Sequence, residues 1–358
     1  MPQMKQLKEL ALEAAGPAAK YDFFIQWHLT ERCNLRCRHC YQTGGSAGAE
    51  LTLTEIKHVI SEISEAIGDW AEDYNMDFSP SFNLTGGEPL LRDDLFHIID
   101  ATRERGFDIF LLTNGTLITA QIAKALANAG VKAVQVSLEG PEQIHDSIRG
   151  KGSFNRSMRG VKNLLDAGLP VTLNATLSDI NASSLPEMVS LAIKNGVRRL
   201  GFSRLVPSGR GAALKEKMLT PQKVNELYKN LFSMNFDDLE IITGDPIASQ
   251  MDIKTIPYAG CTASGGCAAG ISGFTIHADG TMTPCRRLPL PLGNVLTDSI
   301  REIWATSKIL ESLRDRNRYT GKCGSCDRWA FCRGCRAIAH FANGGPEGYL
   351  SEDPQCFI

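Results

Sequence analysis

The sequence has no apolar run long enough to cross a membrane, almost no net charge and no internal repeat. None of its apolar runs reaches the roughly 18 residues that a membrane-spanning helix needs. The N-terminal run MPQMKQLKELALEAAG has an amphipathic helical pattern but lacks the apolar centre of a signal peptide. A net charge of −2 at pH 7 gives no general attraction for nucleic acid. These absences predict a cytoplasmic protein without nucleic-acid or membrane partners.

Cysteine, in contrast, is plentiful, with 11 residues in a chain of 358. In a reducing compartment such cysteines are more often metal ligands than disulfides, and an odd number cannot pair completely. The length allows two domains, or one large one, with a core that folds without cross-links. The composition therefore favours a metal-binding protein of ordinary globular type.

Short apolar runs alternate with amphipathic segments from Phe23 onward, which predicts βαβ units and a parallel sheet. The expected strands cover residues 23–29, 81–84, 108–112, 133–138, 171–175 and 199–204. Helices are expected to begin near Thr52, Asp93, Thr119, Ser153 and Ser184. Thr52 followed by Glu55 indicates a capping box. Six strands are too few for the closed eight-stranded barrel.

Two motifs follow the first two expected strands. Cys33, Cys37 and Cys40 form a C-x3-C-x2-C triplet in TERCNLRCRHCYQ, and three thiolates leave one iron of a cubane cluster without a protein ligand. The run TGGEP, with Gly86-Gly87-Glu88-Pro89, comes next. Together they resemble the radical S-adenosylmethionine (SAM) superfamily. A zinc knuckle is the alternative for the triplet, and the order of the later motifs speaks against it.

The resemblance implies an α/β fold with a partial, TIM-like (β/α)6 barrel. It also implies a [4Fe–4S] cluster on the triplet that binds SAM and cleaves it to a 5′-deoxyadenosyl radical. Residues expected to contact SAM by this resemblance are Gly86, Gly87, Glu88, Pro89, His39, Asn114, Ser137, Arg149 and Asn174. For three of them a structural role is the alternative: a surface ion pair for Arg149, a turn for Asn114 and a buried hydrogen bond for Asn174.

Eight further cysteines follow in the last hundred residues. The block CGSCDRWAFCRGC taken alone would suit zinc, since two short pairs can form a tetrahedral sulfur site. The whole arrangement resembles a SPASM domain, which implies two auxiliary [4Fe–4S] clusters. Carried over, Cys261, Cys267, Cys285 and Cys335 hold the first cluster, and Cys323, Cys326, Cys332 and Cys356 hold the second.

With these ligands the chain has three clusters and no spare thiol, since three, four and four cysteines make 11. One departure concerns Cys335, because two residues separate the last two cysteines of the block where the family usually has three. Two zinc sites, or one cluster and one zinc, remain alternatives. The expected organisation is an extension over 1–21, the barrel over 22–215, a linker with a helix over 216–250 and the SPASM domain over 251–358.

The SPASM resemblance implies a radical SAM maturase that makes an oxidative crosslink, a thioether or a dehydrogenated residue in a ribosomally made peptide or protein. A flavodoxin- or ferredoxin-type electron donor is the expected partner. A separate leader-binding protein is another, because the residues before Phe23 are too few for a leader-binding domain. Cys285 is followed by Arg286 and Arg287, where the related sulfatase maturases carry an aspartate base, which argues against formylglycine formation.

The alternative is modification of tetrapyrrole side chains, since LVPSGRG over 205–211 and CRGCRA over 332–337 resemble segments of enzymes for alternative haem and haem d1 synthesis. Such a substrate would offer carboxylates to Arg204, Arg210, Arg286 and Arg287. Acidic residues of a peptide, or solvent, could meet the same arginines. A third alternative is a non-catalytic electron carrier, but such a protein would not need the TGGEP motif. The remaining histidines on patterned segments, His28, His97, His277 and His340, are expected to be structural.

Overall fold

A computed structural model describes residues 21–43, 49–234, 237–251 and 265–358. Each expected strand is present, and each pairs in parallel with the next along the chain. The six strands are β1 (Tyr21–His28), β2 (Phe78–Thr85), β3 (Asp108–Thr113), β4 (Ala133–Ser137), β5 (Val171–Leu177) and β6 (Arg199–Arg204). The prediction of an α/β fold built on a parallel sheet is confirmed.

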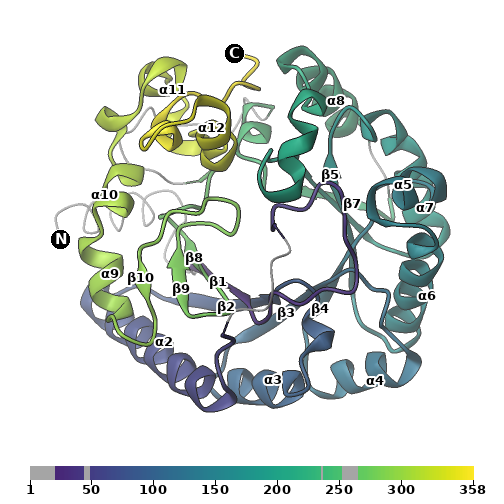
Figure 1. The fold of residues 1–358 in the computed structure, drawn as a ribbon, viewed down its shortest axis with the longest axis horizontal. Coiled ribbons are helices and arrows are strands. Elements are labelled where there is room, and N and C mark those ends of the chain that lie inside the picture. Colours follow the sequence, from purple (N-terminus) through teal and green to yellow (C-terminus); the bar gives the residue numbers. More distant parts are fainter. Residues whose placement is uncertain (1–20, 44–48, 235–236, 252–264) are drawn as a thin grey trace.

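Helices cover the outer face of this sheet, because an amphipathic segment follows each strand (Figure 1). They are α2 (Leu53–Tyr74), α3 (Leu95–Glu104), α4 (Ala120–Asn128), α5 (Glu142–Arg149), α6 (Ser153–Asp166), α7 (Leu185–Lys194) and α8 (Pro221–Ser233). The capping box at the start of α2 is confirmed, since the Thr52 hydroxyl accepts the Glu55 N–H and the Glu55 carboxylate accepts the Thr52 N–H. No helix in the described ranges is both long and apolar enough to cross a bilayer.

The sheet is larger than the sequence pattern predicts, with strand order β10-β9-β8-β1-β2-β3-β4-β5-β6-β7 in the described residues. The short strand β7 (Glu240–Thr243) pairs in parallel with β6 and lies in the expected linker. At the other edge, β8 (Gly273–Ile276) pairs in parallel with β1, and β9 (Thr281–Thr283) and β10 (Gly293–Asn294) continue it antiparallel. One sheet therefore joins the barrel to the cysteine-rich region.

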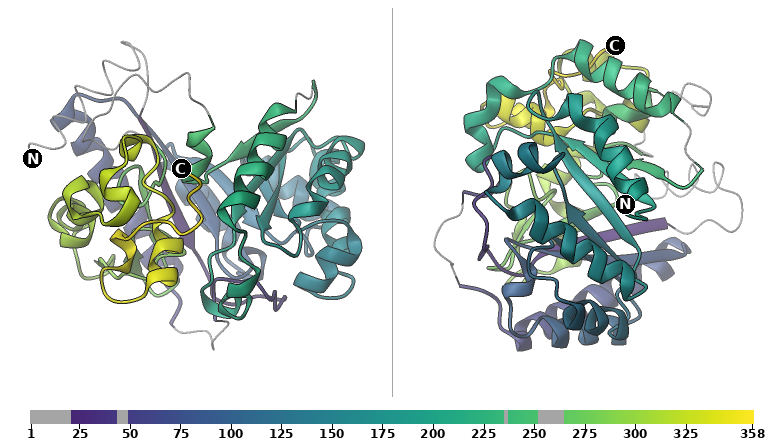
Figure 2. Two further views of the ribbon diagram at one scale, coloured as in Figure 1. Left: turned by 90° about the horizontal axis from the view of Figure 1, so that it is seen from above. Right: turned by 90° about the vertical axis from the view of Figure 1, so that its right-hand side faces the viewer.

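The C-terminal region is built from short helices between irregular segments. Its α-helices are α9 (Ile300–Thr306), α10 (Lys308–Arg314), α11 (Gly321–Ser325) and α12 (Arg336–Asn343). Short 3-10 helices occur along the chain at Pro89–Leu91, Ala182–Ser184, Gly209–Lys217, Pro246–Gln250, Arg316–Arg318, Trp329–Phe331 and Gly348–Leu350. Figure 1 shows α11 and α12 between α10 and α8, and Figure 2 shows this yellow region across the strands from the teal helices.

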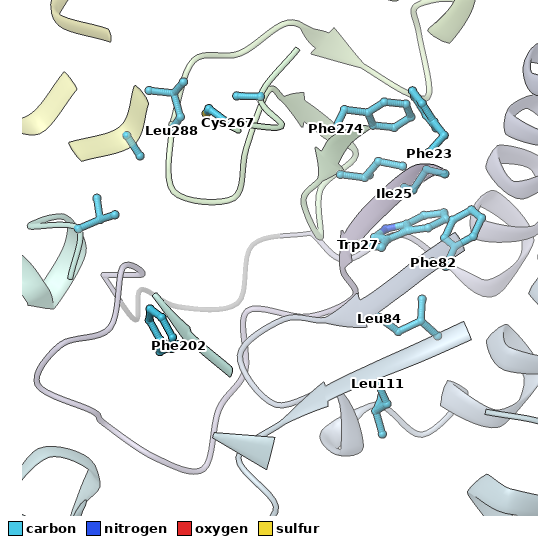
Figure 3. Close-up of a cluster of buried hydrophobic side chains, with 14 of the residues drawn as sticks. Phe23, Ile25, Trp27, Phe82, Leu84, Leu111, Phe202, Cys267, Phe274 and Leu288 are labelled. Atoms are coloured by element: carbon cyan, nitrogen blue, oxygen red, sulfur yellow. The ribbon is translucent and has the colours of Figure 1, made fainter. Parts of the chain in front are cut away.

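Buried residues of the barrel and of the C-terminal region belong to one hydrophobic cluster, some members of which are drawn in Figure 3. Phe23, on β1, makes edge-to-face contacts with Phe274 of β8 and Trp304 of α9, with ring centroids 5.8 and 5.2 Å apart. Such aromatic pairs add specific geometry to the burial of apolar surface. The cysteine-rich region is thus held rigidly against the first strand of the barrel.

A buried ion-pair network makes a second connection. Arg204, at the end of β6, donates to Asp245 (Nη2–Oδ1 2.9 Å) and to Asp353 (Nη2–Oδ2 2.7 Å), and these side chains are 2% exposed or less. Gln355 and the Tyr228 hydroxyl complete the network. The proposal that Arg204 meets a substrate carboxylate is therefore wrong, because two protein carboxylates already surround its guanidinium. We call Arg204, Asp245 and Asp353 the interdomain latch.

Candidate functional site

The loop after β1 brings the cysteine triplet to a cavity at the carboxyl ends of the strands. Cys33, Cys37 and Cys40 all line this cavity. Backbone contacts hold the loop, since Arg210 Nε donates to the Cys37 carbonyl (3.0 Å) and the Gly211 N–H donates to the Cys40 carbonyl (2.9 Å). The carboxyl ends of parallel strands are where such folds place their sites. The three closely spaced cysteines of the triplet therefore line the same cavity.

Burial and a nearby cation have opposing effects on these thiols. Desolvation raises the pKa of Cys33 and of Cys37. Arg149 opposes this at Cys37, where its Nη1 lies 3.7 Å from the sulfur. A guanidinium beside a thiol favours the thiolate, which is the form that binds metal. Arg149 is therefore placed to support a negatively charged sulfur site.

The two glycines of TGGEP pack against the cysteine loop. The Gly87 N–H donates to the Thr30 carbonyl (2.7 Å) and the Glu88 N–H donates to the Arg32 carbonyl (2.8 Å). A Cβ atom on Gly87 would lie 2.2 Å from the Arg32 oxygen, and one on Gly86 would lie 2.4 Å from the Thr30 oxygen. Both glycines line the cavity as well, so they let two backbone segments meet at its wall.

Glu88 and Pro89 lie away from the cavity lining. Glu88 is fully buried, and its carboxylate accepts hydrogen bonds from Thr113 Oγ1 (2.7 Å) and from the Asn114 N–H (2.9 Å). Pro89 is also buried, at the start of a 3-10 helix. In this arrangement Glu88 holds the end of β3, and its expected contact with the ammonium group of SAM stays a prediction.

The other residues expected to contact SAM form a polar ring around the cavity. The structure brings together Asn114, Ser137, Asn174, Arg149 and His39 in its lining. Ser137 and Asn174 are register partners on adjacent strands β4 and β5. The sequence analysis missed further polar residues of the lining, among them Gln135, Thr176 and Ser203. Strand alternation is the signal for two of them, because Gln135 lies two positions before Ser137 on β4 and Thr176 lies two positions after Asn174 on β5.

Glu139 is another residue to which the sequence analysis gave no role. It is fully buried and accepts hydrogen bonds from Arg149 (Nη2–Oε1 2.6 Å), from His39 (Nε2–Oε1 3.1 Å) and from the Thr176 N–H (2.9 Å). Burial alone would raise its pKa, but the charges of His39 and Arg149 hold that pKa far below its usual range. This carboxylate fixes the positions of two side chains that face the cavity.

Three arginines form one wall of the same cavity: Arg210, Arg286 and Arg287. Arg286 lies over the Tyr41 ring, 5.8 Å from its centroid. Arg287 donates to the Arg204 carbonyl (3.4 Å), and its Nε has no hydrogen-bond partner. In the described part of the chain, no carboxylate lies within ion-pair distance of these three guanidinium groups. The wall therefore presents positive charge to whatever occupies the cavity.

A second cavity is lined by cysteines from distant parts of the C-terminal region. Its sulfur-bearing residues are Cys323, Cys326, Cys332 and Cys356. Several N–H groups point at these sulfur atoms: Gln250 Nε2 lies 3.5 Å from Cys332 and 3.7 Å from Cys356, Arg336 Nη2 lies 3.5 Å from Cys323, and the Arg328 N–H lies 3.4 Å from Cys326. Four thiols with N–H donors in an apolar pocket fit a metal–sulfur centre.

Three of the remaining C-terminal cysteines, Cys267, Cys285 and Cys335, lie outside this cavity. Cys335 is fully buried, and burial together with Cys267 raises its pKa to about 12. Cys285 and Cys335 both lie near enough to Arg287 to act on its guanidinium charge. Cys261 falls outside the described residues. The four cysteines of the block CGSCDRWAFCRGC therefore do not share one cavity, because Cys335 is absent from the lining that Cys323, Cys326 and Cys332 form.

Comparisons with known proteins agree with this geometry. A family model described as the radical SAM superfamily matches residues 27–192, and a SPASM model described as an iron–sulfur cluster-binding domain matches residues 267–327. The chain is 33% identical to the AdoMet-dependent heme synthase of Methanosarcina barkeri, over 93% of this chain and 95% of that protein. It is 30% identical to the mycofactocin maturase MftC of Mycobacterium tuberculosis, over 93% of this chain and 82% of that protein.

Among solved structures, Streptococcus suis SuiB bound to S-adenosylmethionine superposes with a TM-score of 0.74 at 16% sequence identity. The match covers 99% of this chain and 81% of SuiB. At this identity the likeness concerns the fold, including its C-terminal region.

Proposed function

The chain belongs to the radical SAM superfamily and carries an iron–sulfur cluster-binding SPASM domain, and from this premise we propose that it is a maturase that oxidises a side chain of a ribosomally made peptide or protein. One observation carries the proposal: a three-thiol site facing a polar cavity and a separate four-thiol site occur in one rigid structure. The 30% identity to mycofactocin maturase MftC supports a peptide substrate. Products of this class are a crosslink, a thioether or a dehydrogenated residue.

The residues around the first cavity fit a cluster with one open iron and SAM. Cys33, Cys37 and Cys40 supply three sulfur ligands, and the described lining offers no fourth cysteine. When bound, such a cluster and SAM supply a 5′-deoxyadenosyl radical that removes a hydrogen atom from the substrate. The protein holds and orients these groups and keeps water away from them.

The residues of the polar ring would bind and orient SAM. Asn114, Ser137 and Asn174 offer hydrogen bonds at the strand ends, where the hydroxyl and carboxylate groups of SAM would lie. His39 and Arg149 face the same space, and Glu139 keeps both in place. Gly86 and Gly87 allow the loop of the triplet to approach the end of β2 closely.

The C-terminal cysteines are assigned to two auxiliary clusters, with Cys323, Cys326, Cys332 and Cys356 at one and Cys261, Cys267, Cys285 and Cys335 at the other. Loss of a hydrogen atom leaves a substrate radical, which must lose one more electron and a proton to complete a two-electron oxidation. A fully ligated cluster has no open iron for the substrate and suits the transfer of that electron. The N–H groups of Gln250 and Arg336, which are directed at cysteine sulfur atoms of this site, would stabilise the reduced form of such a cluster.

The proposed organisation keeps the barrel over 22–215, the connecting segment over 216–250 and the SPASM region over 251–358, with 1–21 as an extension. Pairing of β7 with β6 joins the connecting segment to the barrel, and pairing of β8 with β1 joins the SPASM region to it. A flavodoxin- or ferredoxin-type protein is the proposed electron donor for the first cluster. A separate leader-binding protein is the proposed partner for a substrate with a leader.

A tetrapyrrole is the second candidate substrate, and a specific observation favours it. Arg210, Arg286 and Arg287 present positive charge to the cavity without a carboxylate partner in the described residues. Arginine binds carboxylates with paired hydrogen bonds, and carboxylates are the peripheral groups of haem precursors. The 33% identity to an AdoMet-dependent heme synthase supports this candidate.

One experiment separates the two candidates. Anaerobically reconstituted protein, SAM and a reductant are offered peptides encoded by neighbouring genes and carboxylated tetrapyrroles, and the products are identified by mass spectrometry. A peptide that loses two hydrogens, with 5′-deoxyadenosine formed alongside, supports the maturase. A tetrapyrrole that loses a carboxyl group while every peptide stays unchanged contradicts it. The Cys40→Ala variant should form no 5′-deoxyadenosine in either case.

A further inference from the structure

Three side chains beside the cysteine loop form a cluster that lines neither of the cavities described above. His28 ends β1, Glu31 lies between β1 and Cys33, and His277 follows β8. One metal-ligating atom from each of the three lies within 4.8 Å of the others. We propose that this His–Glu–His cluster binds a divalent transition-metal ion, separate from the iron–sulfur centres.

His28 carries an unsatisfied nitrogen that faces the cluster. The side chain is fully buried, and its Nδ1 has no hydrogen-bond partner. That nitrogen lies 3.9 Å from Glu31 Oε1. The ring centroids of His28 and His277 are 5.0 Å apart, with an interplanar angle of 76°. A buried polar atom without a partner is destabilising. A metal ion would satisfy it.

Each of the three side chains is also held from its far side. Metal-binding histidines characteristically use their second nitrogen in a hydrogen bond that orients the ring. In the metal-binding tautomer the His28 Nε2–H would donate to the Tyr41 hydroxyl oxygen (3.2 Å) and the His277 Nε2–H to Thr283 Oγ1 (3.0 Å), while Gln42 Nε2 donates to Glu31 Oε2 (2.9 Å). One nitrogen of each imidazole and one carboxylate oxygen therefore stay free for a common ligand. This is a built site with an outer shell.

The ligand set selects the type of metal. Two imidazoles and one carboxylate suit zinc or ferrous iron, whereas calcium and magnesium prefer oxygen ligands. Burial disfavours the charged imidazolium and lowers the pKa of His28 and of His277. Metal–ligand bonds of about 2.0–2.1 Å need an inward movement of each atom by roughly 1 Å or less. A bound ion would tie β1, the cysteine loop and β8 together.

The test uses the full-length, cluster-loaded protein without SAM or substrate, with zinc as the probe. One equivalent of zinc is added anaerobically, unbound metal is removed, and zinc and iron are measured by mass spectrometry. We expect about one retained zinc per chain, with nitrogen and oxygen neighbours at about 2.0–2.1 Å in zinc-edge X-ray absorption. His277→Gln should lose at least nine tenths of this zinc. His97→Gln, on an exposed face of α3, should retain it.

Three results would overturn the proposal: no zinc retained by the unaltered protein, sulfur neighbours at about 2.3 Å, or equal retention by His277→Gln. Iron content equal to that of the unaltered protein shows that a variant is folded and loaded. If His277→Gln does not fold, Glu31→Gln replaces it with the same expectation. The measurement needs no radical chemistry, so its outcome is independent of the proposed maturase activity.

Discussion

Replacing Arg204 by methionine should destabilise the protein strongly, because it leaves two buried carboxylates without a cation. Arg204 donates to both Asp245 and Asp353, and all three side chains are 2% exposed or less. Breaking one buried ion pair by removing a partner costs about 3–5 kcal/mol. We expect a loss of at least this size for Arg204→Met. With roughly 2–4 °C per kcal/mol, the unfolding midpoint should fall by about 6–20 °C.

Asp353→Asn should cost less, because the latch has two carboxylates for one guanidinium and the remaining pair is still balanced. Burial would raise the Asp353 pKa, but Arg204 lowers it overall. A carboxyl whose folded pKa is depressed contributes stability above its unfolded pKa of about 3.9, and this contribution is lost as pH falls through the folded pKa. The difference between Asp353→Asn and the unaltered protein should therefore be constant from pH 6 to 8 and shrink only in acid.

The assay is anaerobic thermal unfolding of cluster-loaded protein, followed by circular dichroism, with iron content as a check on loading. Arg199→Met is the matched control, since Arg199 lies on the same strand and pairs with Glu240 at the surface, where the two side chains are 50% and 57% exposed. An exposed pair contributes about 0–1 kcal/mol. Equal midpoints for Arg204→Met and Arg199→Met would refute the reasoning.

Three further predictions concern the site itself. Gly87→Ala places a Cβ 2.2 Å from the Arg32 carbonyl oxygen, so we expect loss of SAM binding in equilibrium dialysis and a lower unfolding temperature. Glu139→Gln removes the carboxylate that holds Arg149, so the dissociation constant for SAM should rise on the order of tenfold, about 1.4 kcal/mol, by calorimetry. Cys356→Ser removes one sulfur of the second cavity, so the iron content should fall by about one [4Fe–4S] cluster per chain.

Each of these predictions has its own control. Gly68→Ala, in α2 with nothing within 4 Å of the new Cβ, should stabilise the protein by about 0.5–1 kcal/mol. Normal SAM affinity in Gly87→Ala, or unchanged affinity in Glu139→Gln, would show that these residues do not shape the cavity. Full iron content in Cys356→Ser would remove Cys356 from the ligands. The first cluster should bind SAM normally in that variant.

Much of the architecture could be predicted from local patterns. The six central strands and five of the helices between them follow from apolar periodicity, because a strand or helix buried on one face must repeat its apolar residues at that element's period, whereas the short helix α5 was not expected. β7 and β8 escaped prediction because each has only four residues, and their pairing partners lie elsewhere in the chain. These short strands form because β7 can pair with the edge of β6 and β8 with the edge of β1.

The site was predictable only in part. Cys33, Cys37 and Cys40 are close in sequence, so their convergence on one cavity follows from a short loop. Glu139 had no sequence signal of its own, since its role depends on meeting His39 and Arg149. The arginines show the same limit. The sequence does not reveal that buried carboxylates already bind Arg204, whereas Arg286 and Arg287 line the cavity.

The sequence alone therefore determined the six central strands, most of the helices between them, the order of the motifs and the family to which they belong. Only the tertiary structure decided that Arg204 belongs to the latch and that His28 and His277 face Glu31. The physical reason is that periodicity and motif spacing report local geometry, whereas burial and charge pairing depend on the three-dimensional packing of segments that are far apart along the chain.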